Sequence, residues 1–276
     1  MQDIENIAYI DGELFADMAD RTVTAAIVSN EAGILSGVAA ACTRGDELGI
    51  DVANIREEGS EIKEGEEVAR FTGPPRQIAL AGESLIGLLA KPSGIATAAR
   101  ACVKAAGRKP KVVCSAWKKM PPAYNEAVRQ AIVTGGALPH IAADPFVYLD
   151  ANHIEMLGGI RQAIEAVTRV AEGQTAVVQI KGKQASIIKE ALEAAESGAG
   201  IIFVDTGVQL DVMEVTYELE RAGLRKKVKV AFGGNITLKD LRKLKGQDID
   251  MVDTGREIAD APFLDMRLEV VDVAES

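Results

Sequence analysis

The alternation of apolar and polar residues divides the chain into two differently organised parts. In residues 11–75, short alternating runs are broken by Gly, Asp and Pro, and the candidate strands are Thr22–Val28, Gly33–Val38 and Glu67–Phe71. From residue 76 to about 106 the apolar residues recur with a helical period, and Pro92-Ser93-Gly94 predicts a break that begins a second helix. The pattern predicts a small β-rich or α+β module followed by helices.

After Pro110 a second rhythm begins, in which continuous apolar strands alternate with amphipathic helices. Strands of this kind are buried on both faces, which indicates a parallel sheet covered by helices. Seven strands fit a closed or nearly closed barrel, and they also fit a doubly wound sheet. The predicted strands are Lys111–Ser115, Ala137–Ala142, Phe146–Asp150, Ala176–Ile180, Gly200–Asp205, Val228–Phe232 and Asp250–Thr254, and the main helices are Pro122–Val133, Ile160–Ala171, Gln184–Ser197 and Val208–Ala222.

Polar residues at the carboxyl ends of these strands favour the barrel, because there the strand ends converge on one pocket. Both histidines of the chain are among them. Taken alone, Asp205 fits an N-cap of the helix that follows it, since Asp is a frequent cap. The group comprises Trp117, Lys118, His140, Asp150, Asn152, His153, Gln179, Lys181 and Asp205.

Two glycine turns follow the last two strands, at Gly233-Gly234-Asn235 and at Gly255-Arg256. Backbone amides that point outward carry partial positive charge, and glycine lets an anion approach them closely. A phosphate site after the last strands recurs in (β/α) barrels. We therefore expect these residues to bind phosphate, although a single Gly-Gly pair is also a common tight turn.

Composition narrows the possible partners. The chain has 276 residues, is 47% apolar and carries a net charge of −10, so it has a large core and no general attraction to nucleic acid or to an anionic membrane. Its three cysteines, Cys42, Cys102 and Cys114, are far apart and predict reduced thiols. The N-terminal residues do not resemble a basic leader region, and we expect no apolar run of transmembrane length. The sequence therefore indicates a cytoplasmic protein.

Several motifs resemble those of the quinolinate phosphoribosyltransferase family, also called nicotinate-nucleotide pyrophosphorylase. Ser93-Gly94-Ile95-Ala96-Thr97 is identical to the family's S-G-I-A-T helix, and residues 31–37 resemble its E-x-G-V-L-A-G strand. The remaining matches follow in the family's order over nearly the whole chain. They are residues 58–65 with Gly73-Pro74, Gly135–His140, Asn152-His153, Ile201–Asp205, Gly233-Gly234, and Gly255 with Pro262–Asp265.

The resemblance implies a fold and a reaction. The fold is an N-terminal α/β sandwich over residues 1–106, a C-terminal seven-stranded TIM-like α/β barrel over residues 107–265, and a tail, residues 266–276, that packs back on the first domain. The reaction belongs to NAD biosynthesis: it joins a pyridine nitrogen to C1 of phosphoribosyl pyrophosphate (PRPP), releases pyrophosphate and needs Mg²⁺. The resemblance also implies a homodimer in which the partner completes the site.

The chain departs from the family pattern where substrate cations are expected. Glu83, Trp117, Ile141 and Asp150 replace three Arg and one Lys, so four cations are lost and two acids are gained. The family's acidic V-E-V-E strand becomes Val178–Lys181, and its S-V-G close becomes Asp253-Thr254-Gly255. Each charge-assisted contact is worth about 1.5–3 kcal/mol, so we predict that quinolinate is not the substrate.

Three hypotheses follow. In the first, a phosphoribosyltransferase uses Lys118 and Arg256 for phosphate or pyrophosphate, and Asp205 for ribose hydroxyls or Mg²⁺. Its acceptor would be another nitrogen heterocycle, in a pocket built from Glu83, Trp117, His140, Asp150, Asn152, His153 and Gln179. In the second, a non-catalytic paralogue binds a phosphorylated ligand or serves as a partner subunit. In the third, a lyase or isomerase uses Asp150 and Lys181 as acid and base, with pKa values shifted towards neutrality by burial.

Overall fold

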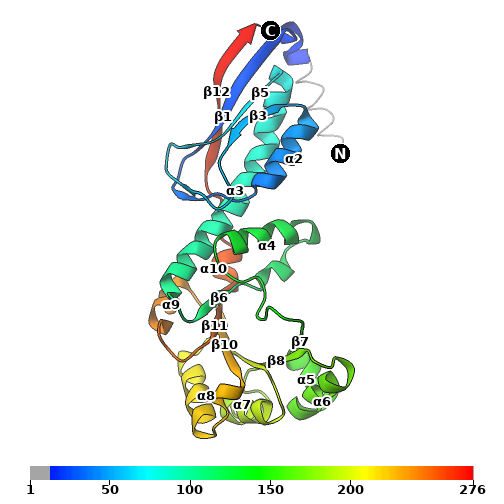
Figure 1. Ribbon diagram of the computed structural model, residues 1–276, viewed down its shortest axis with the longest axis vertical. Helices are drawn as coiled ribbons and strands as arrows, with labels where there is room; N and C mark the ends of the chain where they lie inside the picture. The colour runs from blue at the N-terminus through cyan, green and yellow to red at the C-terminus, as the bar shows by residue number, and fades with distance from the viewer. Residues whose placement is uncertain (1–12, 276) are drawn as a thin grey trace. The chain divides into compact units, whose positions relative to one another are not determined.

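The computed structural model describes residues 13–275 and contains two compact units (Figure 1). The first unit comprises residues 1–100, 123–136 and 260–276, and the second comprises residues 101–122 and 137–259. The expected division at residues 106 and 107 differs from this one chiefly in helix α4 (Asn125–Thr134), which belongs to the first unit. The residues that carry the candidate chemistry lie almost entirely in the second unit.

The first unit is built on an antiparallel four-stranded sheet of order β12-β1-β5-β3. Its strands are β1 (Arg21–Ser29), β3 (Asp51–Ile55), β5 (Glu67–Gly73) and β12 (Met266–Glu275). The pairing of β12 with β1 brings the C-terminal tail back onto the first unit, as the sequence predicts. Smaller elements are η1 (Ala16–Met18) and the pair β2 (Gly33–Ile34) and β4 (Glu61–Ile62).

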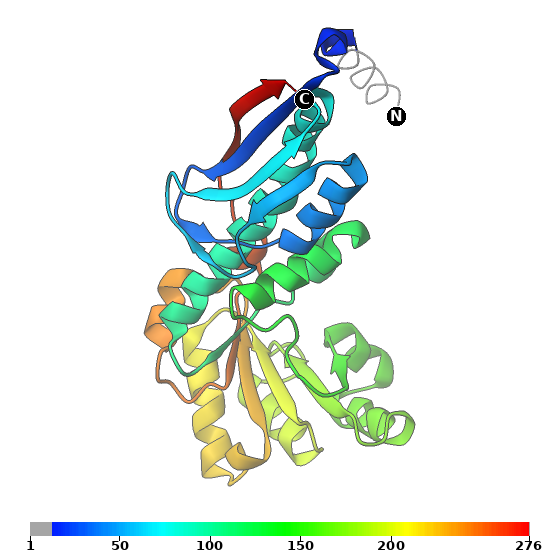
Figure 2. The same cartoon turned by 45° about the horizontal axis from the view of Figure 1, so that its top comes forward.

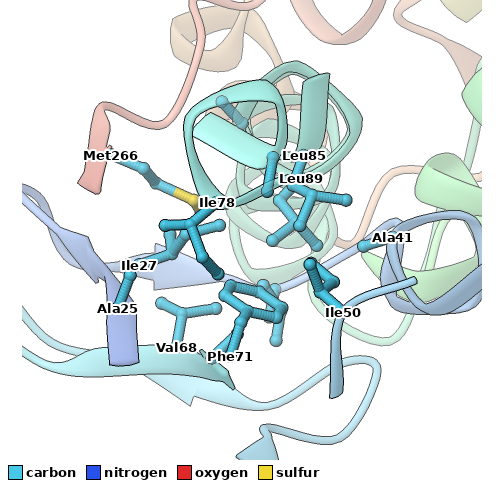
Figure 3. Close-up of a cluster of buried hydrophobic side chains, with 14 of the residues drawn as sticks. Ala25, Ile27, Ala41, Ile50, Val68, Phe71, Ile78, Leu85, Leu89 and Met266 are labelled. Atoms are coloured by element: carbon cyan, nitrogen blue, oxygen red, sulfur yellow. The ribbon is translucent and has the colours of Figure 1, made fainter. Parts of the chain in front are cut away.

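Helices α2 (Val38–Leu48) and α3 (Pro75–Ala106) pack against this sheet. Figure 3 shows Ile27 and Phe71 from the sheet facing Leu85 and Leu89 from α3, and all four side chains are fully buried. The alternation in β1 places every second residue on this face, because side chains of a strand point to opposite sides in turn. The core of the first unit therefore follows directly from the strand and helix periods.

The predicted helix break at Pro92-Ser93-Gly94 is wrong, because α3 continues through Pro92. Proline has no N–H, so the carbonyl of Leu88 loses its usual helical donor. Gly37, at a φ of 96°, lies so close to this carbonyl that a Cβ there would come within 2.1 Å of the oxygen. Ser93 Oγ also accepts a hydrogen bond from the Ser36 amide at 2.9 Å. Packing around the proline thus keeps the helix whole.

The same helix bears on a second expectation, that no apolar run reaches transmembrane length. By length and composition alone α3 could cross a membrane, but half of its most apolar stretch is buried inside the protein. Its buried residues, among them Ile78, Leu85 and Leu89, belong to the core of the first unit. Packing against the sheet accounts for the apolar character of this helix.

The second unit holds a parallel sheet of order β6-β11-β10-β9-β8-β7, so the first strand pairs with the last as a barrel requires. Its strands are β6 (Lys111–Val113), β7 (Phe146–Leu149), β8 (Thr175–Ile180), β9 (Ile201–Asp205), β10 (Lys229–Gly233) and β11 (Met251–Asp253). The α/β class and the barrel-like order are as expected. The predicted strand Ala137–Ala142 is reduced to a single parallel bridge between Leu138 and Val113. Within residues 13–275, the seam between Leu138 and β7 stays unpaired.

Helices follow the strands, and Figures 1 and 2 show α7 and α8 on the outside of β8, β9 and β10. Because the strands are parallel, their carboxyl ends all lie at one edge of the sheet, and this edge carries the candidate site. The helices are α5 (Ala151–Leu157), α6 (Ile160–Val170), α7 (Ile187–Glu196), α8 (Gln209–Arg221), α9 (Leu238–Leu244) and α10 (Gly255–Ala259), with the short turns η2 (Ala116–Lys119), η3 (Pro122–Tyr124) and η4 (Arg225–Lys227).

Candidate functional site

The ends of β8 and β9 bring together three of the predicted site residues. Asp205 Oδ2 accepts a hydrogen bond from Gln179 Nε2 at 2.6 Å and lies 2.7 Å from Lys181 Nζ. Gln179 Oε1 in turn accepts from the Ala151 amide at 3.4 Å. The Asp205 side chain is only 18% exposed, so its charge is held by partners rather than by water. Asp205 is therefore part of a side-chain network, and the structure shows no side-chain cap for helix α8.

The hydrogen bonds of Asp205 also determine how this carboxylate could bind Mg²⁺. Among residues 13–275, no group of three or more His, Cys, Asp or Glu side chains is arranged to hold a metal ion. Asp205 Oδ2 is occupied by Lys181 and Gln179, which leaves Oδ1 as the carboxylate oxygen that can face a ligand. Mg²⁺ commonly binds through one or two carboxylates together with substrate phosphates. The residues fit an ion that arrives with pyrophosphate.

Asp150 has a structural role that the acid–base hypothesis does not anticipate. It is the N-cap of α5, where Oδ1 accepts from the amides of Asn152 at 2.9 Å and His153 at 3.0 Å and lies 2.8 Å from His153 Nδ1. Hydrogen bonding from His153 holds the pKa of Asp150 below its ordinary value. The expected shift towards neutrality is therefore wrong for Asp150, and Lys181 is paired with Asp205 instead.

Trp117 and Lys118 lie on η2, just after β6. Trp117 Nε1 donates to the Pro139 carbonyl at 2.7 Å, and its ring meets the His140 ring edge-on at a centroid distance of 5.2 Å. Lys118 Nζ lies 5.8 Å from the Trp117 ring centroid and 5.6 Å from that of Tyr148. Aromatic faces attract a cation, so the two rings hold the Lys118 ammonium over the strand ends. Trp117 thus packs the rim and positions its neighbours.

Asp253, at the end of β11, is a departure from the family pattern that was not predicted to be a site residue. Its carboxylate accepts from Ser115 Oγ, and the amides of Ser115 and Gly255 also hydrogen-bond to it. Burial raises the pKa of Asp253 against the opposing effect of these donors. The sequence could have indicated this residue, because Asp253 replaces a serine of the family pattern. The Asp253 carboxylate accepts a hydrogen bond from the Gly255 amide, which we had expected to bind phosphate.

The other glycine turn is better suited to an anion. Gly234 has a φ of 109° and Asn235 a φ of 60°, and a Cβ at Gly234 would come within 2.4 Å of the Gly207 amide nitrogen. Gly207 donates to the Gly233 carbonyl at 2.8 Å, which ties this turn to the end of β9. In the described part of the chain, the amides of Gly234 and Asn235 have no hydrogen-bond partner. They are the amides that can receive a phosphate.

A pocket of about 180 Å³ opens between these strand ends. We call it the mouth pocket, and it is lined by Ser115, Lys118, Lys119, His140, Ile141, Phe146, Tyr148, Phe203 and Asp253. Burial, followed by the charges of Asp205, Asp253 and Asp150, raises the pKa of Tyr148, so all three carboxylates act on this phenol. The ammonium groups of Lys118, Lys119 and Lys181 balance these three acids, and the mouth has no excess of positive charge from them.

Glu190, at the start of α7, holds the loop that carries Lys181. The side chain is 4% exposed, and its two oxygens accept from four amides, those of Lys181, Gly182, Gln184 and Ala185, at 2.8–3.3 Å. A buried carboxylate that meets amide donors on every side fixes the backbone around it. Glu190 is therefore a positioning residue for Lys181, and its buried place on α7 could not be read from the sequence alone.

We expect Glu190→Gln to lower the free energy of unfolding by about 2–4 kcal/mol, because the amide group cannot accept from two of the four buried donors. Glu196→Gln, on the exposed part of the same helix, is the matched control. Denaturant unfolding measures both. A loss below about 0.5 kcal/mol for Glu190→Gln, the range of ordinary surface changes, would contradict the role assigned to Glu190.

Three of the remaining predicted residues, Asn152, His153 and Arg256, do not line the mouth pocket. Asn152 and His153 are exposed on α5, and Glu83 is exposed on α3 of the first unit. Arg256 lies on α10. All three cysteines are free thiols, and burial raises the pKa of Cys102 to about 11 and that of Cys114 to about 12. Buried thiols with a raised pKa are inert, so neither Cys102 nor Cys114 is indicated as a nucleophile.

Comparison with known proteins adds an independent result. Residues 7–93 match the description "Quinolinate phosphoribosyl transferase, N-terminal domain", and residues 95–269 match the corresponding C-terminal domain. A probable nicotinate-nucleotide pyrophosphorylase [carboxylating] from Archaeoglobus fulgidus is 32% identical over 91% of this chain and 95% of its own length. The human nicotinate-nucleotide pyrophosphorylase [carboxylating] is 29% identical over 89% of this chain and 82% of its own length.

Solved structures with the same fold include two nicotinate-nucleotide pyrophosphorylases. The one from Pyrococcus furiosus has a TM-score of 0.84 at 21% identity, covering 97% of this chain and 74% of that chain. The one from Francisella tularensis has a TM-score of 0.81 at 20% identity, covering 97% and 95%. At these identities the likeness concerns the fold.

Proposed function

Because this chain belongs to the quinolinate phosphoribosyl transferase family, we propose that it transfers the phosphoribosyl group of PRPP to a nitrogen heterocycle other than quinolinate. The charge of the mouth pocket is the observation that supports an acceptor other than quinolinate. Three carboxylates, Asp150, Asp205 and Asp253, act on the phenol of Tyr148, which lines the mouth pocket. Because Lys118, Lys119 and Lys181 already balance these acids, the mouth has no surplus cation for the two carboxylates of a dianionic acceptor.

The acceptor that fits is neutral or cationic and carries N–H donors. Tyr148, His140 and Phe203 supply the apolar and aromatic wall of the mouth pocket, and Asp253 supplies an acceptor oxygen at its edge. Such a pocket binds the face of a heterocycle by packing and its N–H edge by hydrogen bonding. Substrate preference then follows from the change from serine to Asp253 and from the loss of the family's cations.

In the reaction we propose, the ring nitrogen of the acceptor forms a bond to C1 of PRPP while the bond from C1 to the pyrophosphate oxygen breaks. The amides of Gly234 and Asn235 hold the 5′-phosphate, and Lys118 with Arg256 meets the pyrophosphate that leaves. Asp205, fixed by Gln179 and Lys181, accepts hydrogen bonds from the ribose hydroxyls. Aligned and fixed groups of this kind lower a barrier by positioning reactants and by matching developing charge.

Mg²⁺ belongs to the same proposal. When bound, it neutralises charge on the pyrophosphate, and Asp205 Oδ1 is the described carboxylate oxygen that would face it. A homodimer and a cytoplasmic location, which the family resemblance and the reduced cysteines suggest, remain part of the proposal. Size-exclusion chromatography with light scattering measures the first.

The function is tested by thermal stability and by pyrophosphate release. We expect PRPP with Mg²⁺ to raise the melting temperature, and a panel of neutral and cationic heterocycles to contain at least one acceptor that releases pyrophosphate. Quinolinate is expected to react at least about 100-fold more slowly than that acceptor, which corresponds to the loss of two charge-assisted contacts. Rapid turnover of quinolinate would contradict the proposed specificity.

Two other outcomes have distinct meanings. Stabilisation by PRPP without pyrophosphate release from any heterocycle would favour a non-catalytic paralogue that binds a phosphorylated ligand. No stabilisation by PRPP at all would contradict transferase activity itself. Asp150 caps α5 and Lys181 pairs with Asp205, which supports the transferase over a lyase or isomerase that would use these two residues as acid and base.

A further inference from the structure

A second cavity of the second unit lies at the amino ends of β6, β10 and β11, opposite the mouth pocket. Its volume is about 560 Å³, three times that of the mouth pocket. We call it the base cavity, and its lining includes Arg108, Lys111, Leu138, Ala143, Lys229 and Met251. The amino end of a barrel is normally a packed region that serves stability, so a cavity of this size needs an explanation.

Strand geometry directs two lysines into this cavity. Side chains two residues apart in a strand share a face, so Lys111 lies on the face of Val113 and Lys229 on the face of Ala231. Val113 and Ala231 belong to the core cluster inside the sheet. The strand between β6 and β10 is β11, whose Met251 pairs with Lys111 on one side and with Ala231 on the other. Lys111 and Lys229 thus flank Met251 on the inner face.

The positive charge at this end is only partly neutralised. Asp250, the acid in the lining, lies 2.9 Å from Arg225 Nη2 and 3.2 Å from Lys109 Nζ and also accepts from the Val230 amide at 2.8 Å. Among residues 13–275, no ion pair or side-chain hydrogen bond engages Lys111, Lys229 or Arg108. Three cations therefore surround the cavity without a counter-charge, in a chain whose net charge is −10.

The rest of the lining is apolar and small. The segment Leu138–Ala143 passes the unpaired seam of the sheet and contributes Leu138, Pro139, Ile141 and two alanines. Because this segment forms one bridge instead of a strand, and Ala231 is the inner residue of β10, no bulky side chain fills the space. An apolar wall with a few convergent charged groups, at a volume within about 300–1,000 Å³, is the usual make-up of a small-molecule site.

We propose that the base cavity is a second ligand site, separate from the mouth pocket, for a small organic anion. The ligand has an apolar or aromatic body, which packs on Leu138, Ile141 and Met251. It carries a carboxylate or phosphate group, which Lys111 and Lys229 bind, with Arg108 at the rim. This site goes beyond the proposed transferase function and does not depend on it.

The base cavity and the mouth pocket share a wall, the segment that contains His140 and Ile141. His140 and Ile141 line both cavities, and the Pro139 carbonyl, which borders the base cavity, accepts the hydrogen bond from Trp117 Nε1. A ligand that orders this segment also changes the freedom of His140 and Trp117. Coupling between two sites requires an element that both contact, and this segment is that element.

The test uses calorimetric titration of the full chain with phenyl phosphate and with isophthalate, and benzyl alcohol as the uncharged control. We expect one equivalent of at least one anion to bind and benzyl alcohol not to bind. The variant Lys111→Met/Lys229→Met, which keeps side-chain length and removes charge, is expected to bind at least tenfold more weakly. Lys226→Met/Lys227→Met, which changes two exposed lysines of η4, is the matched control and should bind like the unmodified protein.

Two further variants separate the base cavity from the mouth. Lys118→Met in the mouth pocket should leave the affinity unchanged, whereas Ala143→Trp, at an exposed edge of the base cavity, should block binding without altering charge. A crystal soaked with 5-bromoisophthalate should show anomalous density beside Lys111 and Lys229. Failure of both anions to bind, loss of binding in Lys118→Met, or density confined to the mouth pocket would each overturn the proposal. If only one anion binds, that result identifies the anionic group.

Discussion

Replacing Asp253 by serine is expected to strengthen the binding of PRPP at neutral pH by about ten- to hundredfold, or about 1.4–2.8 kcal/mol. Asp253 directs a carboxylate at the amides of Ser115 and Gly255, which is where an anionic ligand has to compete with it. Serine keeps a small polar side chain, removes the negative charge and releases the Gly255 amide. Titration of both proteins with PRPP and Mg²⁺ measures the change.

The pH dependence gives a second readout of the same residue. Because burial raises the pKa of Asp253 above the unfolded value, protonation is easier in the folded protein, and the ionised form is the destabilised one. The contribution of Asp253 to the free energy of unfolding is therefore fully present at a pH below the pKa of Asp253 in the unfolded chain. This contribution is lost as the pH rises through the higher pKa that Asp253 has in the folded protein. We expect the affinity for PRPP to increase as pH falls through that range.

Asp253→Asn is the control for this profile, since the phosphates of PRPP also titrate near pH 6. The asparagine variant should keep only the ligand's own pH dependence, and the difference between the two curves belongs to Asp253. Equal affinities of the unmodified protein and Asp253→Ser, together with superimposable profiles for Asp253→Asn, would show that this carboxylate does not compete with the ligand.

Replacing Lys118 by alanine is expected to reduce the thermal stabilisation by PRPP and to lower pyrophosphate release at least about 100-fold. The ammonium group is held between the faces of Trp117 and Tyr148 and borders the mouth pocket. A pyrophosphate that gains charge as it leaves depends on such a fixed cation more than the bound substrate does. The fall should therefore be larger in kcat than in 1/KM.

Lys189→Ala is the matched control, because this lysine is exposed on α7 and does not line the mouth pocket. Both variants should unfold at the temperature of the unmodified protein in the absence of ligand. Unchanged turnover in Lys118→Ala would remove this residue from the site. A fall confined to 1/KM would assign it to ground-state binding only.

The family and the main elements could be predicted from the sequence because they depend on local and repeated patterns. Continuous apolar strands gave β8, β9 and β10 within a residue or two, and the helical period gave α6 and α8. The helix break predicted at Pro92 was wrong because the cost of a proline in a helix depends on what lies against the carbonyl that has lost its donor, here Gly37. The strand predicted at Ala137–Ala142 was wrong because apolar residues of this segment, among them Leu138 and Ile141, line a cavity instead of pairing with a strand.

The candidate site, too, could be predicted from the sequence only in part. That Lys118, Asp205, Gln179 and Lys181 stand at strand ends is a property of the chain, and parallel strands necessarily bring such ends to one edge. Which groups neutralise one another depends on distances of a few ångströms between separate strands. Those distances pair Lys181 with Asp205, make Asp150 a helix cap, and place Asp253 against the Gly255 turn. Periodicity and motif order thus determined the architecture, whereas the charges that remain available to a ligand are decided only by the folded chain.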